Sequence, residues 1–164
     1  MKKKCLLDTN AVSSLTQEHS EDYDKISAKV ESLEVKLYVS ILSLYEMEYG
    51  AYHADDPDIA HKARLAIQLI KDEDEITILP LTEKGAEIFG EIKEQYRKEK
   101  GIGKKALQKH NVDLVLAATA IEVGATFVSH DNKAWGFLVA VVSLAAVQHR
   151  MIPQARRATL AQRP

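Results

Sequence analysis

The 164-residue sequence has a single cysteine, Cys5, and this scarcity excludes several kinds of site. One cysteine cannot form an intramolecular disulfide, and it has no companion for a CxxC zinc-binding pair. Such a chain fits a reducing compartment, where thiols stay unpaired. We therefore predict a cytoplasmic protein in which Cys5 is a small buried hydrophobic residue of the first strand.

The sequence also has no long apolar stretch and little net charge. The longest apolar run, Phe137–Val147, contains Ser143 and is about half of what a bilayer span requires. The basic start Met1–Lys4 has the charge of a signal peptide, but the apolar run behind it stops at Asp8. The net charge of −2 gives no overall attraction to nucleic acid or membrane. We predict neither export nor membrane insertion, and any polyanion must be held by a local patch.

Short apolar strands alternate with amphipathic helices along the chain, and this pattern predicts one α/β domain. The length is sufficient for a single well-filled core. The predicted strands lie at 4–8, 35–40, 76–79, 125–129 and 139–142. The predicted helices begin near residues 11, 26, 43, 57, 83 and 111.

Several residues have the chemistry of helix ends. They are Thr82 and Asn111 as caps of the helices that follow, and Gly101 and Gly124 as helix terminators. Ser43 and Glu46 match the Ser-x-x-Glu capping box, in which each side chain bonds to the backbone at the other residue. A capping box would explain Glu46 without any catalytic role.

Acidic residues recur where a predicted strand ends or the next helix begins. They are Asp8, Glu46, Asp113 and Asp131. Taken singly, they have structural explanations: Asp8 can cap a helix with Thr9 and Asn10, and Asp113 is stabilised by a helix dipole. In a β/α chain with right-handed crossovers, however, all strand ends open on one edge of the sheet, where ligands bind. We therefore predict that the four carboxylates meet in one crevice.

Carboxylates crowded into a crevice repel one another, by about 4 kcal/mol for two charges about 4 Å apart at an effective dielectric near 20. A divalent cation removes this repulsion. Ligation by oxygen alone suits Mg2+ or Mn2+ rather than zinc, and the six histidines form no i, i+4 pair. A metal held there would activate water and clamp a scissile phosphate.

The most basic stretch before the tail surrounds a glycine-rich turn at 98–109. It carries Lys98, Lys100, Lys104, Lys105 and Lys109. The stretch is either a solvated loop or a rim that grips the phosphates of a polynucleotide, because lysines bind such backbones without reading sequence. For the second alternative, Lys104, Lys105 and Lys109 are the candidate RNA-binding residues.

The order and spacing of these acidic motifs resemble the PIN-domain ribonucleases, and among them the VapC-like toxins of type II toxin–antitoxin systems. The matching segments are 6–10, 39–51, 111–120 and 124–131. The resemblance implies a three-layer α/β/α sandwich with a mainly parallel central sheet. It also implies Mg2+- or Mn2+-dependent endoribonuclease activity, a homodimer, and inhibition by a small antitoxin protein.

The resemblance assigns roles by position. Asp8, Glu46, Asp113 and Asp131 correspond to the catalytic, metal-binding acids of the family. Thr9, Asn10 and Ser129 correspond to small polar helpers that orient substrate or water.

Two features depart from the family pattern. The loop at 104–110 lacks the compact Gly-Asp approach to the third acid, which leaves substrate specificity open. The family usually ends after a short final strand, so we assign the nuclease domain to 1–142 and an atypical basic tail to 143–164. The composition of this tail, which contains Arg150, Arg156, Arg157 and Arg163, favours disorder over a role in binding RNA or a partner.

Two other functions stay open at the level of sequence. An aspartate-based phosphotransferase would use Asp8 as phospho-acceptor, although Asn10 stands where that class requires a second aspartate. A nuclease-dead RNA-binding module would use the acids only as helix caps.

Overall fold

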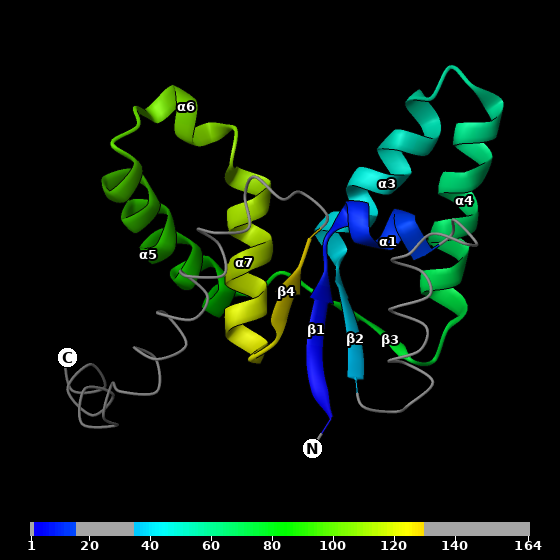
Figure 1. The fold of residues 1–164 in the computed structure, drawn as a ribbon, viewed down its shortest axis with the longest axis horizontal. Helices are drawn as coiled ribbons and strands as arrows, with labels where there is room; N and C mark the ends of the chain where they lie inside the picture. The colour runs from blue at the N-terminus through cyan, green and yellow to red at the C-terminus, as the bar shows by residue number, and fades with distance from the viewer. Residues whose placement is uncertain (1, 16–34, 130–164) are drawn as a thin grey trace, which may run out of the picture.

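Four parallel strands organise the part of the chain that the computed structural model describes, residues 2–15 and 35–129 (Figure 1). They are β1 (Lys3–Leu7), β2 (Val35–Ser40), β3 (Ile76–Leu79) and β4 (Thr126–Val128), in the spatial order β3-β2-β1-β4. The predicted helix near residue 26, the predicted strand at 139–142, Asp131 and the tail at 143–164 lie outside the described residues.

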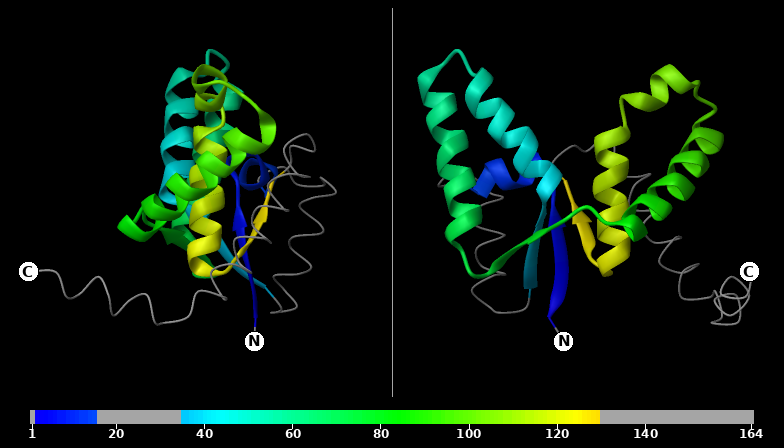
Figure 2. Two further views of the ribbon diagram at one scale, coloured as in Figure 1. Left: turned by 90° about the vertical axis from the view of Figure 1, so that its left-hand side faces the viewer. Right: turned by 180° about the vertical axis from the view of Figure 1, so that it is seen from behind.

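Six helices in the described ranges surround the sheet. They are α1 (Thr9–Leu15), α3 (Ile41–His53), α4 (Pro57–Asp72), α5 (Glu83–Lys100), α6 (Lys104–Gln108) and α7 (Asn111–Val123). Figures 1 and 2 show two arms, α3 with α4 and α5 with α6 and α7, on either flank of the edge at which the strands end, here called the carboxyl edge. None of these helices has the length and apolar character needed to cross a membrane.

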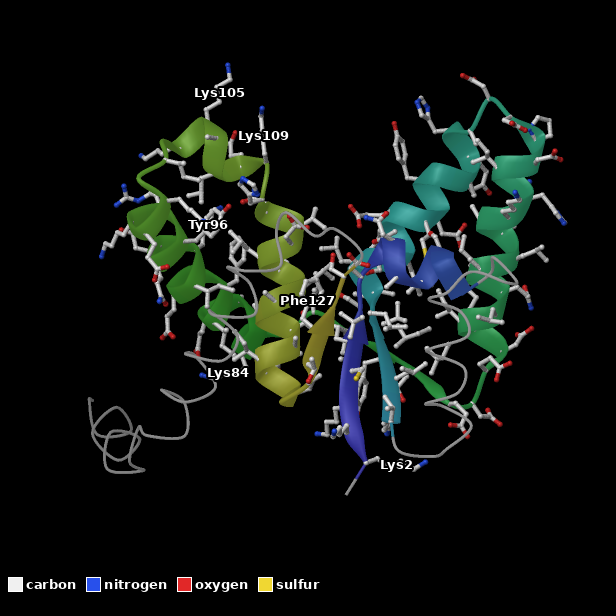
Figure 3. All side chains as sticks on the ribbon, viewed as in Figure 1. Lys2, Lys84, Tyr96, Lys105, Lys109 and Phe127 are labelled. Atoms are coloured by element: carbon white, nitrogen blue, oxygen red, sulfur yellow. The ribbon has the colours of Figure 1, made fainter. Side chains whose placement is uncertain are left out.

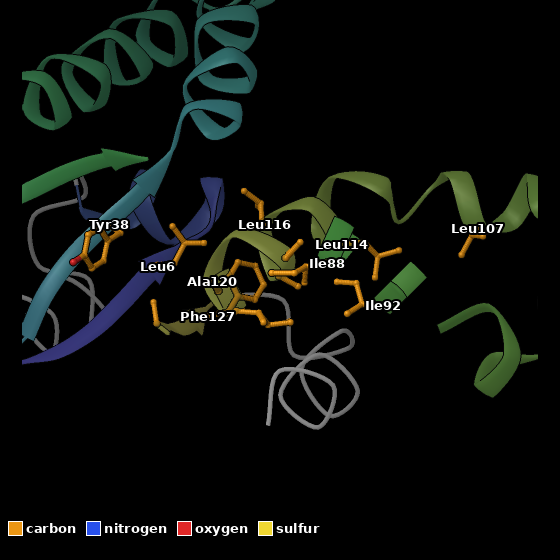
Figure 4. Close-up of a cluster of buried hydrophobic side chains, with 13 residues drawn as sticks. Leu6, Tyr38, Ile88, Ile92, Leu107, Leu114, Leu116, Ala120 and Phe127 are labelled. Atoms are coloured by element: carbon orange, nitrogen blue, oxygen red, sulfur yellow. The ribbon is translucent and has the colours of Figure 1, made fainter. Parts of the chain in front are cut away.

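The register of the sheet divides the core into two layers. Leu6 of β1 pairs with Tyr38 and Phe127, and these three side chains enter one cluster with α5 and α7 (Figure 4). Leu7, the next residue, pairs with Val39 and enters a second cluster with α1, α3 and α4. Because successive side chains of a strand point to opposite faces, both faces of the sheet are covered by helices. The predicted three-layer α/β/α sandwich is confirmed.

The predicted capping box of α3 is wrong. The helix begins directly after β2, and the hydroxyl of Ser40 accepts the cap hydrogen bond from Leu42 N at 3.2 Å. Ser43 therefore lies inside the helix, where it is buried and its Oγ has no hydrogen-bond partner among the described residues. Because the helix starts earlier than predicted, Glu46 lies in its second turn and its carboxylate is not used to cap it.

The other helix ends follow the predictions with one exception. Thr82 caps α5 with its side chain, and Gly101 and Gly124 end α5 and α7 with φ of 61° and 65°. Left-handed φ values of this kind favour glycine, since it has no Cβ. Asn111 was predicted to cap α7, but His110 holds the cap position and Asn111 is already the first helical residue.

Strand β4 is shorter than the predicted strand at 125–129. Ala125 N donates a 2.8 Å hydrogen bond to the carbonyl of Ala120, so it closes the end of α7 before the strand begins. Cys5, expected to be buried, is half-buried in β1.

Candidate active site at the carboxyl edge

Asp8 joins the end of β1 to the start of α1. Its amide donates a 2.9 Å hydrogen bond to the carbonyl of Val128, which extends the pairing of β1 with β4 by one residue. Its Oδ1 accepts a 2.6 Å hydrogen bond from Ala11 N, so the side chain is the N-cap of α1. The residue is only 8% exposed. The carboxylate is thus held in a fixed position beside the carboxyl edge.

Thr9 links α1 to α3. Its hydroxyl donates a 2.6 Å hydrogen bond to Oε2 of Glu46, and this contact is partly buried. A carboxylate that accepts so short a bond is held firmly, because hydrogen bonds to charged acceptors are shorter and stronger than neutral ones. The bond places the Glu46 carboxylate next to the first turn of the helix that Asp8 caps.

Asp113 lies in the first turn of α7, which stands on the other flank of the carboxyl edge (Figures 1 and 3). The chain turns at Gly124 from α7 into β4, and β4 runs parallel to β1. The first turn of α7 therefore lies toward the edge at which Asp8 is found. Asp113 is thus on the same edge of the sheet as Asp8.

Tyr96 of α5 packs beside the first turn of α7, and Figure 3 shows it between these two helices. Its ring lies 5.1 Å from the ring of His110, centroid to centroid, at an angle of 56°. Burial raises the pKa of Tyr96 above its usual value, and the nearby Asp113 carboxylate raises it further. Tyr96 therefore keeps its proton and presents a neutral phenol beside Asp113.

The other predicted site residues differ in their exposure and in whether the structure describes them. Asn10 is exposed in the first turn of α1, and Ser129 is half-buried directly after β4. Asp131 lies outside the described ranges. Lys104 and Lys105 are exposed on α6, and Lys109, at its end, is exposed as well. Figure 3 shows Lys105 and Lys109 projecting from α6 away from the sheet.

A divalent cation fits these residues by donor chemistry. The side chains of Asp8, Glu46 and Asp113 offer only oxygen, which Mg2+ and Mn2+ prefer. Asn111, in the same turn as Asp113, has a buried Oδ1 with no hydrogen-bond partner among the described residues. Within 2–15 and 35–129, however, no three His, Cys, Asp or Glu residues are grouped closely enough to hold a metal.

Sequence reasoning missed two features of this edge. Ser40, and not Ser43, starts α3, and the signal was its position as the last residue of a predicted strand. Tyr45, Tyr49 and Tyr52 are 68%, 67% and 83% exposed on the same helix. Their i, i+4, i+7 spacing was visible in the sequence and places them on one face.

Solved structures similar to this chain include VapBC and FitAcB proteins. VapBC2 from Rickettsia felis, bound to a DNA fragment from its promoter, shares 24% identity over 80% of this chain and 90% of that chain, with a TM-score of 0.57. VapBC-1 from nontypeable Haemophilus influenzae shares 22% identity over 81% and 90%, with a TM-score of 0.58. FitAcB from Neisseria gonorrhoeae shares 22% over 85% and 93%, with a TM-score of 0.57. At these identities the likeness shows a common fold.

No match was found among curated proteins. The family model of the PIN domain, in contrast, matches residues 5–136, which include the six helices described above, β2, β3, β4 and all of β1 except its first two residues. The chain therefore belongs to the PIN domain family.

Proposed function

We propose that this protein is a Mg2+- or Mn2+-dependent endoribonuclease and the toxin of a toxin–antitoxin pair. The observation that carries the proposal is the hydrogen bond from Thr9 to Glu46, which fixes a second carboxylate beside the helix capped by Asp8. Membership of the PIN domain family supports a nuclease, and the similarity to VapBC and FitAcB supports the toxin role.

The proposed catalytic and metal-binding residues are Asp8, Glu46, Asp113 and Asp131. When bound among them, a divalent ion supplies Lewis acidity for hydrolysis of a phosphodiester bond. Asp8 is held by the amide of Ala11 and Glu46 by the hydroxyl of Thr9, so both carboxylates are positioned before a substrate arrives. Such preorganisation lowers the cost of reaching the reactive geometry.

Supporting roles follow from position. Thr9 orients Glu46, and Asn10 and Ser129 are proposed to orient substrate or water at the ends of β1 and β4. Lys104, Lys105 and Lys109 give one arm of the molecule a basic tip, which we propose attracts the RNA backbone.

The proposed partners are an RNA substrate, a small antitoxin protein and a second copy of the chain. The similar structures include a member of the VapBC family of toxin–antitoxin systems, and we extend that arrangement to this chain by proposal. We also propose a cytoplasmic location, where an RNA substrate and an antitoxin would be available.

The test is cleavage of a mixed RNA pool with Mg2+ or Mn2+ by the parent protein and by Asp8→Asn and Asp113→Asn. We expect each variant to cleave about a hundredfold more slowly or worse. Asp74→Asn is the matched control, because Asp74 is exposed and precedes β3 at the opposite edge of the sheet. Variants that cut as fast as the parent would refute the site.

Calorimetric titration with Mn2+ separates the proposed nuclease from a nuclease-dead RNA-binding module. The nuclease binds Mn2+, and the Asp8→Asn variant binds it more weakly. A folded protein that binds RNA but takes up no Mn2+ would instead be such a module.

A further inference from the structure

Asp113 lies in the part of α7 that the core holds least. The first fully buried residue of this helix is Leu114, which is 1% exposed. The three residues before it, Asn111, Val112 and Asp113, are only half-buried. The first amides of a helix also have no partner within the helix itself, so a first turn needs support from outside. The position of Asp113 therefore depends on what holds the start of α7.

In the described part of the chain, the start of α7 is held by backbone hydrogen bonds and not by a side-chain cap. His110 occupies the cap position, and its side chain makes no cap hydrogen bond. His110 N donates to the carbonyl of Leu107 at 3.1 Å, and Leu114 N donates to the carbonyl of His110 at 3.0 Å. The imidazole is not used for capping, so it is left for a contact with a neighbouring helix.

That contact is with Tyr96 of α5. The rings of Tyr96 and His110 lie 5.1 Å apart, centroid to centroid, and their planes are tilted by 56°. Aromatic rings at this separation attract one another beyond the area that they bury. Tyr96 in turn packs on the core cluster that includes Ile92, one turn earlier on α5 (Figures 3 and 4). The ring pair therefore connects the cap position of α7 to a helix that the core anchors.

The other end of the α5–α7 pair has a link of its own. Thr82 begins α5, and its hydroxyl donates a 2.7 Å hydrogen bond to Oε1 of Glu122, near the end of α7. This bond and the ring pair lie at opposite ends of two antiparallel helices. The ring pair thus fixes the end of α7 that carries Asp113.

Tyr96 also lies near Asp113 itself. Burial raises the pKa of Tyr96, and the Asp113 carboxylate raises it further. A like charge has this effect on a group in its neighbourhood. The tyrosine that packs on the cap position therefore borders the proposed metal ligand as well.

We propose that Tyr96 and His110 are positioning residues, whose ring contact holds the first turn of α7, and with it Asp113, where a divalent ion is bound. The use of Asp113 as a metal ligand rests on the proposed function. Asp8 and Glu46 are each held by a hydrogen bond to the carboxylate. Asp113 is held through the start of its helix, and neither ring is proposed as a ligand of the ion.

Hydrogen exchange of the metal-free protein tests whether the ring pair holds the first turn. The amides of 114–117 bond to the carbonyls of 110–113 and report on that turn. We expect His110→Ala and Tyr96→Leu each to raise their exchange rates about tenfold, and the amides of β1 and β2 to exchange as in the parent. His110→Phe keeps a ring against Tyr96 and should exchange like the parent, because the imidazole that it replaces makes no cap hydrogen bond.

Calorimetric titration with Mn2+ tests whether the ring pair positions the metal ligand. His110→Ala and Tyr96→Leu should each bind Mn2+ about tenfold more weakly than the parent, a loss typical of removing a group that orients a ligand. His110→Phe should bind Mn2+ like the parent. In the double variant with both substitutions the losses should not add, because either one alone breaks the ring pair.

His53→Ala is the matched control. It also removes an imidazole that stacks on a tyrosine, since the rings of His53 and Tyr49 lie 5.3 Å apart, but this pair belongs to α3 in the other arm of the molecule. We expect it to change neither exchange at 114–117 nor the affinity for Mn2+. Circular dichroism checks that each variant is folded.

Three results would overturn the proposal. Exchange at 114–117 is unchanged in His110→Ala and Tyr96→Leu, or exchange rises while the affinity for Mn2+ stays that of the parent. Alternatively, His110→Phe loses as much affinity as His110→Ala, which shows that a ring at this position is not enough. A parent protein that binds no Mn2+ refutes the proposed metal-dependent nuclease instead, and the exchange rates then still decide whether the ring pair holds the first turn.

Discussion

Thr9 Oγ1 and Glu46 Oε2 are joined by a 2.6 Å hydrogen bond across 37 positions of sequence. The bond ties the first turn of α1 to the second turn of α3, so two helices that leave neighbouring parallel strands are fixed to each other. It also holds one carboxylate beside the helix that another carboxylate caps. The hydroxyl of Thr9 therefore adds a direct polar link to the packing that holds Asp8 and Glu46 near each other.

Replacing this hydroxyl should loosen Glu46. We expect Thr9→Val to lower the free energy of unfolding by about 1 kcal/mol and RNA cleavage by about tenfold, because Glu46 loses its hydrogen-bond donor while the volume is kept. Thr9→Ser retains the donor and should resemble the parent. Urea unfolding and cleavage rates measure the effects. In a double-mutant cycle with Glu46→Gln the two changes should not be additive, and strict additivity would contradict the coupling.

Asp8 has a capping role and a proposed catalytic role, and two substitutions separate them. Asp8→Asn keeps an oxygen that accepts from Ala11 N, so we expect the unfolding free energy to stay within about 1 kcal/mol of the parent while cleavage is lost. Asp8→Ala removes the cap and should also cost about 0.5–2 kcal/mol. Chemical denaturation beside the cleavage assay gives both numbers. If Asp8→Asn cleaves normally, the residue is only a cap.

The ionisation of Tyr96 reports on Asp113. The pKa of Tyr96 is raised from its ordinary value of 10.0, first by burial and then by the Asp113 charge. We expect Asp113→Asn to lower this pKa part of the way back, because burial, the larger cause, persists. The absorbance of the phenolate, taken as the difference between parent and Tyr96→Phe in metal-free buffer, measures it. An unchanged pKa would mean that the two side chains are not close.

The raised pKa of Tyr96 also predicts how the free energy of unfolding changes with pH. Above pH 10 the unfolded chain releases the Tyr96 proton while the folded protein retains it, so the contribution of Tyr96 to stability is lost as pH rises through its folded pKa. Tyr96→Phe should therefore flatten the decline of the urea midpoint in alkaline buffer. Tyr52→Phe is the control, because Tyr52 is exposed on α3.

Two glycines should respond to alanine in opposite directions. Gly124 ends α7 with φ of 65°, so Gly124→Ala forces a side chain into the left-handed region and should cost about 1–2 kcal/mol. Gly90 lies inside α5 with nothing within 4 Å of an added Cβ. Gly90→Ala should therefore stabilise the protein by about 0.5–1 kcal/mol. Thermal or urea unfolding of both variants tests the pair, and equal signs would contradict the account.

Local patterns predicted most of the framework. The apolar run that contains Leu6 and Leu7 predicted a short strand at 4–8, and the structure has β1 there with helices on both of its faces. Thr82 and Gly124 mark helix ends because a hydroxyl acceptor and a residue without Cβ are needed at those points whatever the rest of the fold does. Signals of this kind depend on a few neighbouring residues, so they can be recognised from the sequence alone.

Predictions failed where a residue had more than one available partner. Ser43 and Glu46 have the spacing of a capping box, but β2 delivers the chain directly into α3 at Ser40, and the competing cap begins the helix first. Asn111 is a good cap by type, yet His110 occupies that position. The sequence shows which side chains are able to form a cap, and the point at which the helix begins decides which of them does.

The sequence by itself determined an α/β domain with parallel strands, apolar on both faces, and acids placed where strands end. The tertiary structure decided that Glu46 bonds Thr9 instead of its own helix, that Tyr96 lies beside Asp113, and that three tyrosines of α3 face solvent. The physical reason is that strand and helix periodicity follow from local backbone geometry, whereas the partner of a polar side chain is fixed only when distant elements pack together.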